Sequence, residues 1–357
     1  MSELIALDVP KARQLLQMTM DDTSVDLGWS ACGRWLAAAT TSGVVHVVDA
    51  ATGALHTQWL AHETGALSLC WHPRQALLAS GGQDSLVRLW QVTEASAAAL
   101  VGEAAIGDKP VNGWVEHLAW RPDGEQLAAA CGSVICLLAS DGSRETVHNF
   151  PGGTVGALCW RPKGAQLAVG GYGGVRIYNV LDPDSKPQDL SWKGSLLSLS
   201  WSPDGQVIAA GCQDNTVHFW RLPVKRDAMM SGFDYKPLQL SWSTNSRWLL
   251  TGGSAQLILW PFDKQGPEGR SPLTREFHRA AVCAISIAQS GQRLATGCRA
   301  GQIAFWKQLG DPTPEFVADL DSRVEQLSWS PHKHSRQLAS TSRLGVLNLW
   351  EAAPAIQ

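Results

Sequence analysis

Long apolar runs are missing from this 357-residue sequence, and none approaches the roughly 18 residues that a membrane-spanning helix needs. Charged residues make up only 17% of it, with a net charge of -3, so no global field attracts nucleic acid or a membrane surface. The N-terminal stretch carries Glu3 and Asp8 in place of a continuous apolar core, which argues against a secretory signal peptide. These absences predict a soluble, cytoplasmic protein with no membrane partner.

Signatures of catalysis and of cofactor binding are also missing. There is no G-x-S-x-G nucleophile motif and no Walker-type loop. The run Gly170-Gly171-Tyr172-Gly173-Gly174 looks like a phosphate loop, but no helical pattern follows it, so we interpret it as a turn between strands. We therefore expect no enzyme activity, no cofactor and no small-molecule substrate.

Metal-binding patterns are weak as well. The eight cysteines include no C-x-x-C pair, and we expect them to be reduced thiols that fill apolar space. His332-Lys333-His334 offers two ligands on a turn but lacks a third. A metal-handling or enzymatic protein that uses Cys and His stays open as an alternative, and zinc analysis of purified protein would test it.

Tryptophan is abundant, with 17 residues, and most of them are periodic. The stretch from Gly65 to Gln91 holds three short apolar runs separated by Gly, Pro and Asp turns, which is typical of an antiparallel meander. Its first run ends in an anchor Trp that recurs at steps of 42, 49, 40, 41, 41, 45 and 42 residues, by subtraction of sequence positions. The anchors are Trp29, Trp71, Trp120, Trp160, Trp201, Trp242, Ile287 (in place of Trp) and Trp329. A regular period of this length indicates a repeat architecture.

The period, turns such as Ser202-Pro203-Asp204-Gly205, and a second Trp in several units resemble the WD-repeat β-propeller family. The resemblance covers nearly the whole chain. In that family a His, a Ser or Thr, an Asp and a Trp form a structural hydrogen-bond set within each blade. His62, Ser80, Asp84 and Trp90 occupy these places in the second unit, and the other units keep only part of the set.

The resemblance implies an all-β fold in which each unit forms one four-stranded blade. Eight units lie between residues 25 and 351, so we predict eight blades in a single domain over 1–357; seven, the commoner family number, is the alternative. The last unit stops after three strands, and a spare segment, 11–20, precedes the first unit. We expect 11–20 to pair with the last blade and close the ring, because this removes two exposed edges.

In the family, one face is lined by the loops before the first strand and between the second and third strands of each blade. On this chain those loops supply aromatic and basic residues that suit an interface. They are Trp114, Tyr172, Trp192, Lys193, Tyr235, Lys236, Arg279, Arg299, Arg323 and Arg343.

These residues predict a half-basic face that binds an acidic peptide or protein segment, although an ordinary solvated rim would have the same composition. The function predicted is a non-enzymatic protein–protein interaction scaffold. A nucleic-acid-associated subunit is a further alternative, which the negative net charge disfavours.

Overall fold

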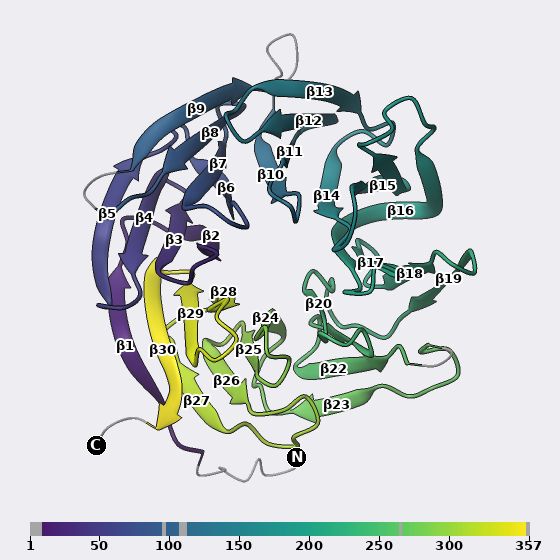
Figure 1. Ribbon diagram of the computed structural model, residues 1–357. Coiled ribbons are helices and arrows are strands. Elements are labelled where there is room, and N and C mark those ends of the chain that lie inside the picture. Colours follow the sequence, from purple (N-terminus) through teal and green to yellow (C-terminus); the bar gives the residue numbers. More distant parts are fainter. Residues whose placement is uncertain (1–8, 95–97, 107–112, 264–265, 355–357) are drawn as a thin grey trace.

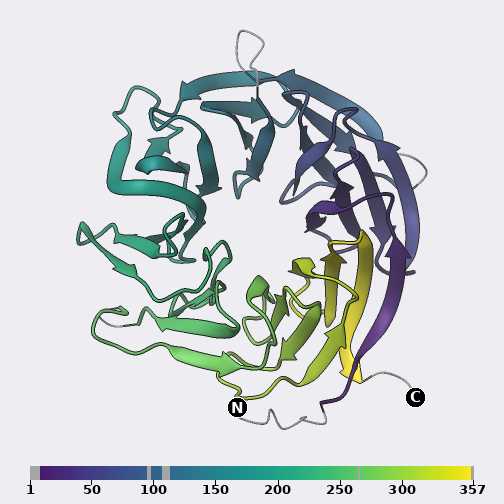
Figure 2. The ribbon, with the colours of Figure 1, turned by 180° about the vertical axis from the view of Figure 1, so that it is seen from behind.

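The structure is a computed structural model that describes residues 9–94, 98–106, 113–263 and 266–354. Within these residues the chain is built from β-strands and turns, arranged as a ring of sheets that stand around a common centre (Figures 1 and 2). Each sheet runs from a short inner strand to an outer strand on the rim. Residues 1–8, on which the argument about a signal peptide rests, lie outside the described residues.

The first three units form three regular antiparallel blades. Their strands are β2 (Ser24–Trp29), β3 (Trp35–Thr40), β4 (Val44–Asp49), β5 (Ala54–Leu60); β6 (Ala66–Trp71), β7 (Leu77–Gly82), β8 (Leu86–Gln91), β9 (Ala99–Ala105); and β10 (Val115–Trp120), β11 (Gln126–Cys131), β12 (Val134–Ala139), β13 (Arg144–Asn149). The second and third strands are apolar and buried on both faces, because each blade is packed between two neighbours.

The last three units also form blades of four strands. Their strands are β20 (Leu240–Trp242), β21 (Trp248–Thr251), β22 (Gln256–Pro261), β23 (Leu273–Glu276); β24 (Val282–Ile287), β25 (Leu294–Cys298), β26 (Gln302–Trp306), β27 (Phe316–Asp319); and β28 (Val324–Trp329), β29 (Gln337–Ser342), β30 (Val346–Pro354), β1 (Ala12–Thr19).

The fourth and fifth units share one six-stranded sheet. It holds β14 (Val155–Trp160), β15 (Gln166–Asn179), β16 (Gln188–Trp201), β17 (Val207–Cys212), β18 (Val217–Arg221) and β19 (Arg226–Met230). The described strands therefore form seven blades, six of four strands and one of six, and the prediction of eight blades was wrong.

The physical reason is the length of β15 and β16, which are 14 residues each. β16 pairs with β15 as far as Ser195 and with β17 from Leu196 onward. It passes from the outer position of one repeat to the inner position of the next without a break, so two sequence repeats become one hydrogen-bonded sheet.

The two ends of the chain meet in one sheet. β1 pairs antiparallel with β30, from Thr19 opposite Val346 to Ala12 opposite Pro354. Met20 N extends this pairing by donating to Gly345 O at 2.8 Å. The segment before β1 also reaches the preceding blade, because Val317 N donates to Pro10 O at 3.0 Å. The N-terminal strand thus contacts both of the last two blades.

The anchor tryptophans join neighbouring repeats at the inner strands. In each case the indole Nε1 donates to the backbone carbonyl that precedes the anchor of the previous repeat. These bonds, here called the indole latches, are Trp29 to Ser328 (2.9 Å), Trp71 to Gly28 (3.0 Å), Trp120 to Cys70 (3.2 Å), Trp160 to Ala119 (2.8 Å), Trp201 to Cys159 (3.3 Å), Trp242 to Ser200 (3.4 Å) and Trp329 to Ser286 (3.1 Å). Ile287 occupies the remaining anchor position, and it has no indole to reach from β24 to β20.

The eight cysteines are free thiols, and four of them are buried in strands. The described part of the chain contains no helix that could span a membrane.

Candidate interaction face

The hydrogen-bond set of the second unit holds its loop and strands together. His62 Nε2 lies 2.9 Å from Ser80 Oγ, and His62 Nδ1 lies 3.0 Å from Asp84 Oδ1. Trp90 Nε1 donates to Ser80 Oγ at 2.9 Å. Arg88, which the sequence reasoning missed, also donates to Asp84 Oδ2 at 2.6 Å.

Electrostatics fit a structural role for this set. Burial lowers the pKa of His62, although the Asp84 carboxylate partly offsets it. Burial acts to raise the pKa of Asp84, but hydrogen bonds from Arg88 and His62 outweigh it and hold that pKa below its usual value. A neutral imidazole and a paired carboxylate therefore bind each other at neutral pH.

A second polar network, in the first unit, contains a Ser, an Asp and a His. His46 Nε2 lies 2.8 Å from Asp21 Oδ1, and Ser42 Oγ donates to the other oxygen of Asp21. A nucleophilic triad needs the hydroxyl to contact the imidazole, which then takes its proton. Here Ser42 contacts the carboxylate, so this network ties a loop to its blade and does not activate the hydroxyl.

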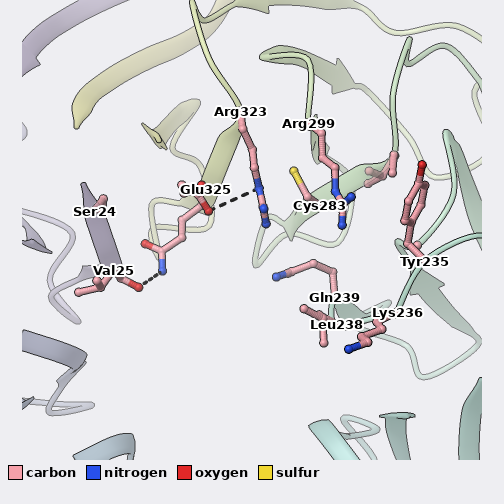
Figure 3. Close-up of a pocket in the computed structure, with 14 residues that line it drawn as sticks. Ser24, Val25, Tyr235, Lys236, Leu238, Gln239, Cys283, Arg299, Arg323 and Glu325 are labelled. Carbon is pink, nitrogen blue, oxygen red and sulfur yellow. Dashed lines mark hydrogen bonds and ion pairs between the residues drawn. The ribbon is translucent and has the colours of Figure 1, made fainter. Parts of the chain in front are cut away.

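Four of the ten predicted face residues line one cavity of about 250 Å³, here called the basic pocket (Figure 3). These are Tyr235 and Lys236, in the loop before β20, Arg299, between β25 and β26, and Arg323, just before β28. Other residues that line it are Ser24, Leu238, Gln239, Cys283, Glu325 and Gln326. The pocket lies where the inner strands β2, β24 and β28 begin.

The charged side chains of the basic pocket are only partly paired. Arg299 lies over the Tyr235 ring, with its guanidinium carbon 4.5 Å from the ring centroid. Arg323 Nε lies 3.6 Å from Glu325 Oε2. Of the described residues that line the pocket, Glu325 supplies the one carboxylate against three cations. Burial raises the pKa of the Cys283 thiol to about 11, so it adds no charge at neutral pH.

The wall of the pocket toward β2 is fixed by Gln326. Its Nε2 donates to Val25 O at 2.9 Å and to Asp26 Oδ1 at 3.3 Å. Asp26 is partly buried and also accepts from Leu69 N at 2.7 Å, so one carboxylate connects three repeats. Burial raises the pKa of Asp26 to about 6, against the effect of these hydrogen bonds.

Of two further predicted residues, Arg343 lies next to the basic pocket and Arg279 contacts the outer strand β27. The backbone N of Arg343 donates to Arg323 O at 2.9 Å, and the Arg343 side chain is exposed. Arg279 is exposed too and lies 3.5 Å from Asp319. Neither residue lines the basic pocket.

The remaining predicted residues lie elsewhere. Trp192 stacks on His218 with ring centroids 3.9 Å apart and packs against a core cluster, and Lys193 beside it is exposed. Trp114 is 51% exposed before β10, and Tyr172 is 67% exposed in β15. Tyr172 lines a separate cavity of about 350 Å³. The structure thus divides the predicted face, and brings three of its six cations together in the basic pocket.

Sequence reasoning missed the residues that complete the basic pocket. Ser24, Glu325 and Gln326 belong to inner strands, whereas the prediction considered only loops. Glu325 and Gln326 follow the buried Val324 at the start of the inner strand β28. Polar residues in that position indicate side chains near the end of the strand where the pocket lies. Within the described part of the chain, no group of three or more His, Cys, Asp or Glu side chains is placed to hold a metal ion.

Comparison with known proteins supports the repeat assignment. The family model described as "WD domain, G-beta repeat" matches residues 53–91, 188–221 and 269–307. The chain is 28% identical over 149 residues to "Cell division cycle 20.1, cofactor of APC complex" of Arabidopsis thaliana, which covers 39% of this chain and 31% of that protein. It is 26% identical over 325 residues to "Anaphase-promoting complex subunit cdh1" of Dictyostelium discoideum, which covers 87% of this chain and 40% of that protein. The chain spans less than half the length of these relatives.

Among solved structures, the computationally designed Ika8 protein has a TM-score of 0.76 with 16% identity, over 95% of this chain and 99% of that one. This similarity concerns the fold, in which sheets surround a centre as they do here. Three stretches of the chain thus match the WD-repeat model, and its ring of sheets is a β-propeller.

Proposed function

We propose that this protein is a non-enzymatic interaction scaffold that binds an acidic segment of a partner protein at the basic pocket. The observation that carries the proposal is the convergence of Lys236, Arg299 and Arg323, from three consecutive repeats, on one cavity with a single carboxylate. Complementary charge directs encounter and selects the partner. The relatives support an adaptor role, since their names describe cofactors or subunits of a protein complex.

The surroundings of the pocket suit a protein partner. Tyr235 and Leu238 line the pocket and are each 47% exposed, so they offer apolar contact beside the charges. Interfaces commonly combine an aromatic or Arg anchor with a polar rim. The cations occupy one compact site and do not form a long stripe, which favours a peptide segment over a nucleic-acid backbone.

The test is affinity purification from the native host, followed by mass spectrometry, with wild type and Arg299→Glu/Arg323→Glu. We expect the double reversal to lose its partners while keeping its melting temperature. The matched control is Lys163→Glu/Lys307→Glu, which makes the same charge change at exposed sites outside the pocket. If the pocket variant recovers the same partners in the same amounts as the control, the pocket is not the docking site.

A further inference from the structure

The charges of the basic pocket indicate how much negative charge its ligand carries. This inference rests on the function proposed above. Lys236, Arg299 and Arg323 contribute three positive charges, and Glu325 contributes one negative charge, which leaves +2 among the described lining residues. Asp26 lies behind Gln326 and does not line the pocket. Both of its oxygens already accept hydrogen bonds within the protein. The charge that a ligand meets is therefore that of the four lining residues.

Hydrogen-bond donors at the pocket are also left without acceptors. Arg299 lies over the Tyr235 ring, and its side-chain N–H groups make no hydrogen bond or ion pair to the described residues. Arg323 Nε is buried and makes no hydrogen bond to the described residues, and its contact with Glu325 is long, at 3.6 Å. Ser24 is 5% exposed, and its buried Oγ has no partner among the described residues.

Buried donors without acceptors are unfavourable, and a ligand that supplies acceptors removes that cost. The donors of Ser24, Arg323 and Arg299 come from three different repeats, so several oxygen atoms are needed to reach them. One carboxylate supplies two oxygens and one charge. A phosphate monoester supplies three oxygens and a charge near -2 at neutral pH, and two adjacent carboxylates supply four oxygens and -2.

We infer that the basic pocket recognises a doubly charged oxyanion group on the partner segment and discriminates against a single carboxylate. The group is either a phosphorylated side chain or a pair of adjacent acidic residues. In both cases Arg323 and Arg299 bind the oxygens, Lys236 adds charge, and Ser24 donates from the β2 side of the cavity.

The experiment compares three fluorescein-labelled nine-residue peptides that are identical except at two central positions. The first carries Ser-Glu, the second Glu-Glu and the third phosphoserine-Gly, and each has one flanking Leu to contact Tyr235 and Leu238. Fluorescence anisotropy with the full chain gives the dissociation constants. We expect at least one doubly charged peptide to bind at least tenfold more tightly than Ser-Glu, and the tighter of the two identifies the source of the charge.

Two variants connect binding to the donors. Arg299→Ala should abolish the preference for doubly charged peptides. Ser24→Ala should weaken binding of the preferred peptide several-fold and leave binding of the Ser-Glu peptide unchanged. Lys163→Glu/Lys307→Glu should bind all three peptides as wild type does. Equal binding of all three peptides, or no binding of any, would overturn the inference. Partner capture that depends on Arg299 and Arg323 would still support the proposed function in that case, so the two failures are distinguishable.

Discussion

Replacing Trp160 with Phe tests whether the indole latches hold the ring together. Trp160 is 7% exposed, and its Nε1 donates to Ala119 O in the preceding repeat at 2.8 Å, the shortest of the latches. Phe keeps an aromatic ring in the core but cannot donate a hydrogen bond. The variant therefore removes one contact between adjacent inner strands and leaves the apolar packing largely in place.

The expected cost has two parts. Losing a typical hydrogen bond costs about 0.5–1.5 kcal/mol, and losing the second ring of the indole from a buried site adds about 1–2 kcal/mol. Trp160→Phe should thus lower the free energy of unfolding by about 2–3 kcal/mol. Trp242→Phe should cost less, because its bond to Ser200 O is longer, at 3.4 Å.

Urea unfolding followed by circular dichroism measures both changes, with Trp248→Phe as the matched control. Trp248 is a half-buried residue of β21 at which the structure shows no indole latch. The loss in free energy of unfolding should be largest for Trp160→Phe, smaller for Trp242→Phe and smallest for Trp248→Phe. If the three variants lose the same stability, the latches contribute nothing beyond packing and the reasoning is refuted.

Two other predictions concern pH and ring closure. Burial raises the pKa of Asp26 to about 6, so its contribution to stability is present below about pH 4 and is lost as pH rises to 6. Burial lowers the pKa of His278 to about 4, so its contribution is lost as pH falls from 6.5 to 4. Relative to wild type, the free energy of unfolding of Asp26→Asn should rise by about 3 kcal/mol as pH rises from 4 to 6. That of His278→Gln should fall, relative to wild type, by about as much between pH 4 and 6.5. Unfolding series at several pH values check both, and parallel curves for all three proteins would contradict them. Removing residues 1–20 exposes the edge of β30, so we expect a lower melting temperature and concentration-dependent association in light scattering; a monomer of unchanged melting temperature would contradict this.

The repeats were predictable because the anchor tryptophans have a structural task that fixes their spacing. Each anchor reaches the inner strand of the previous repeat, so the period in the sequence follows the geometry of the ring. The blade count was not predictable in this way. Sheets are defined by hydrogen bonds between strands, and nothing in the stretch from Gln188 to Trp201 marks that β16 continues unbroken from one repeat into the next.

The loop residues of the basic pocket were predictable from the sequence, whereas its strand residues were not. Family spacing places Tyr235, Lys236, Arg299 and Arg323 on loops of one face, and the structure gathers them in one cavity. Trp192 has similar spacing, yet it stacks on His218 of the same sheet, a contact that depends on the long β16. Ser24 and Gln326 join the pocket through the meeting of the first and last blades, which a linear sequence does not show.

The pairing of β1 with β30 also determines how the molecule yields to force. Ala12 lies opposite Pro354, so the two chain ends leave the sheet at the same end of an antiparallel pair. Tension applied through the termini therefore breaks the backbone hydrogen bonds between β1 and β30 one after another. It does not load all of them at once, as sliding one strand along the other would. In a single-molecule stretching experiment the ring should open at low force from Ala12 toward Thr19 before any other blade unravels.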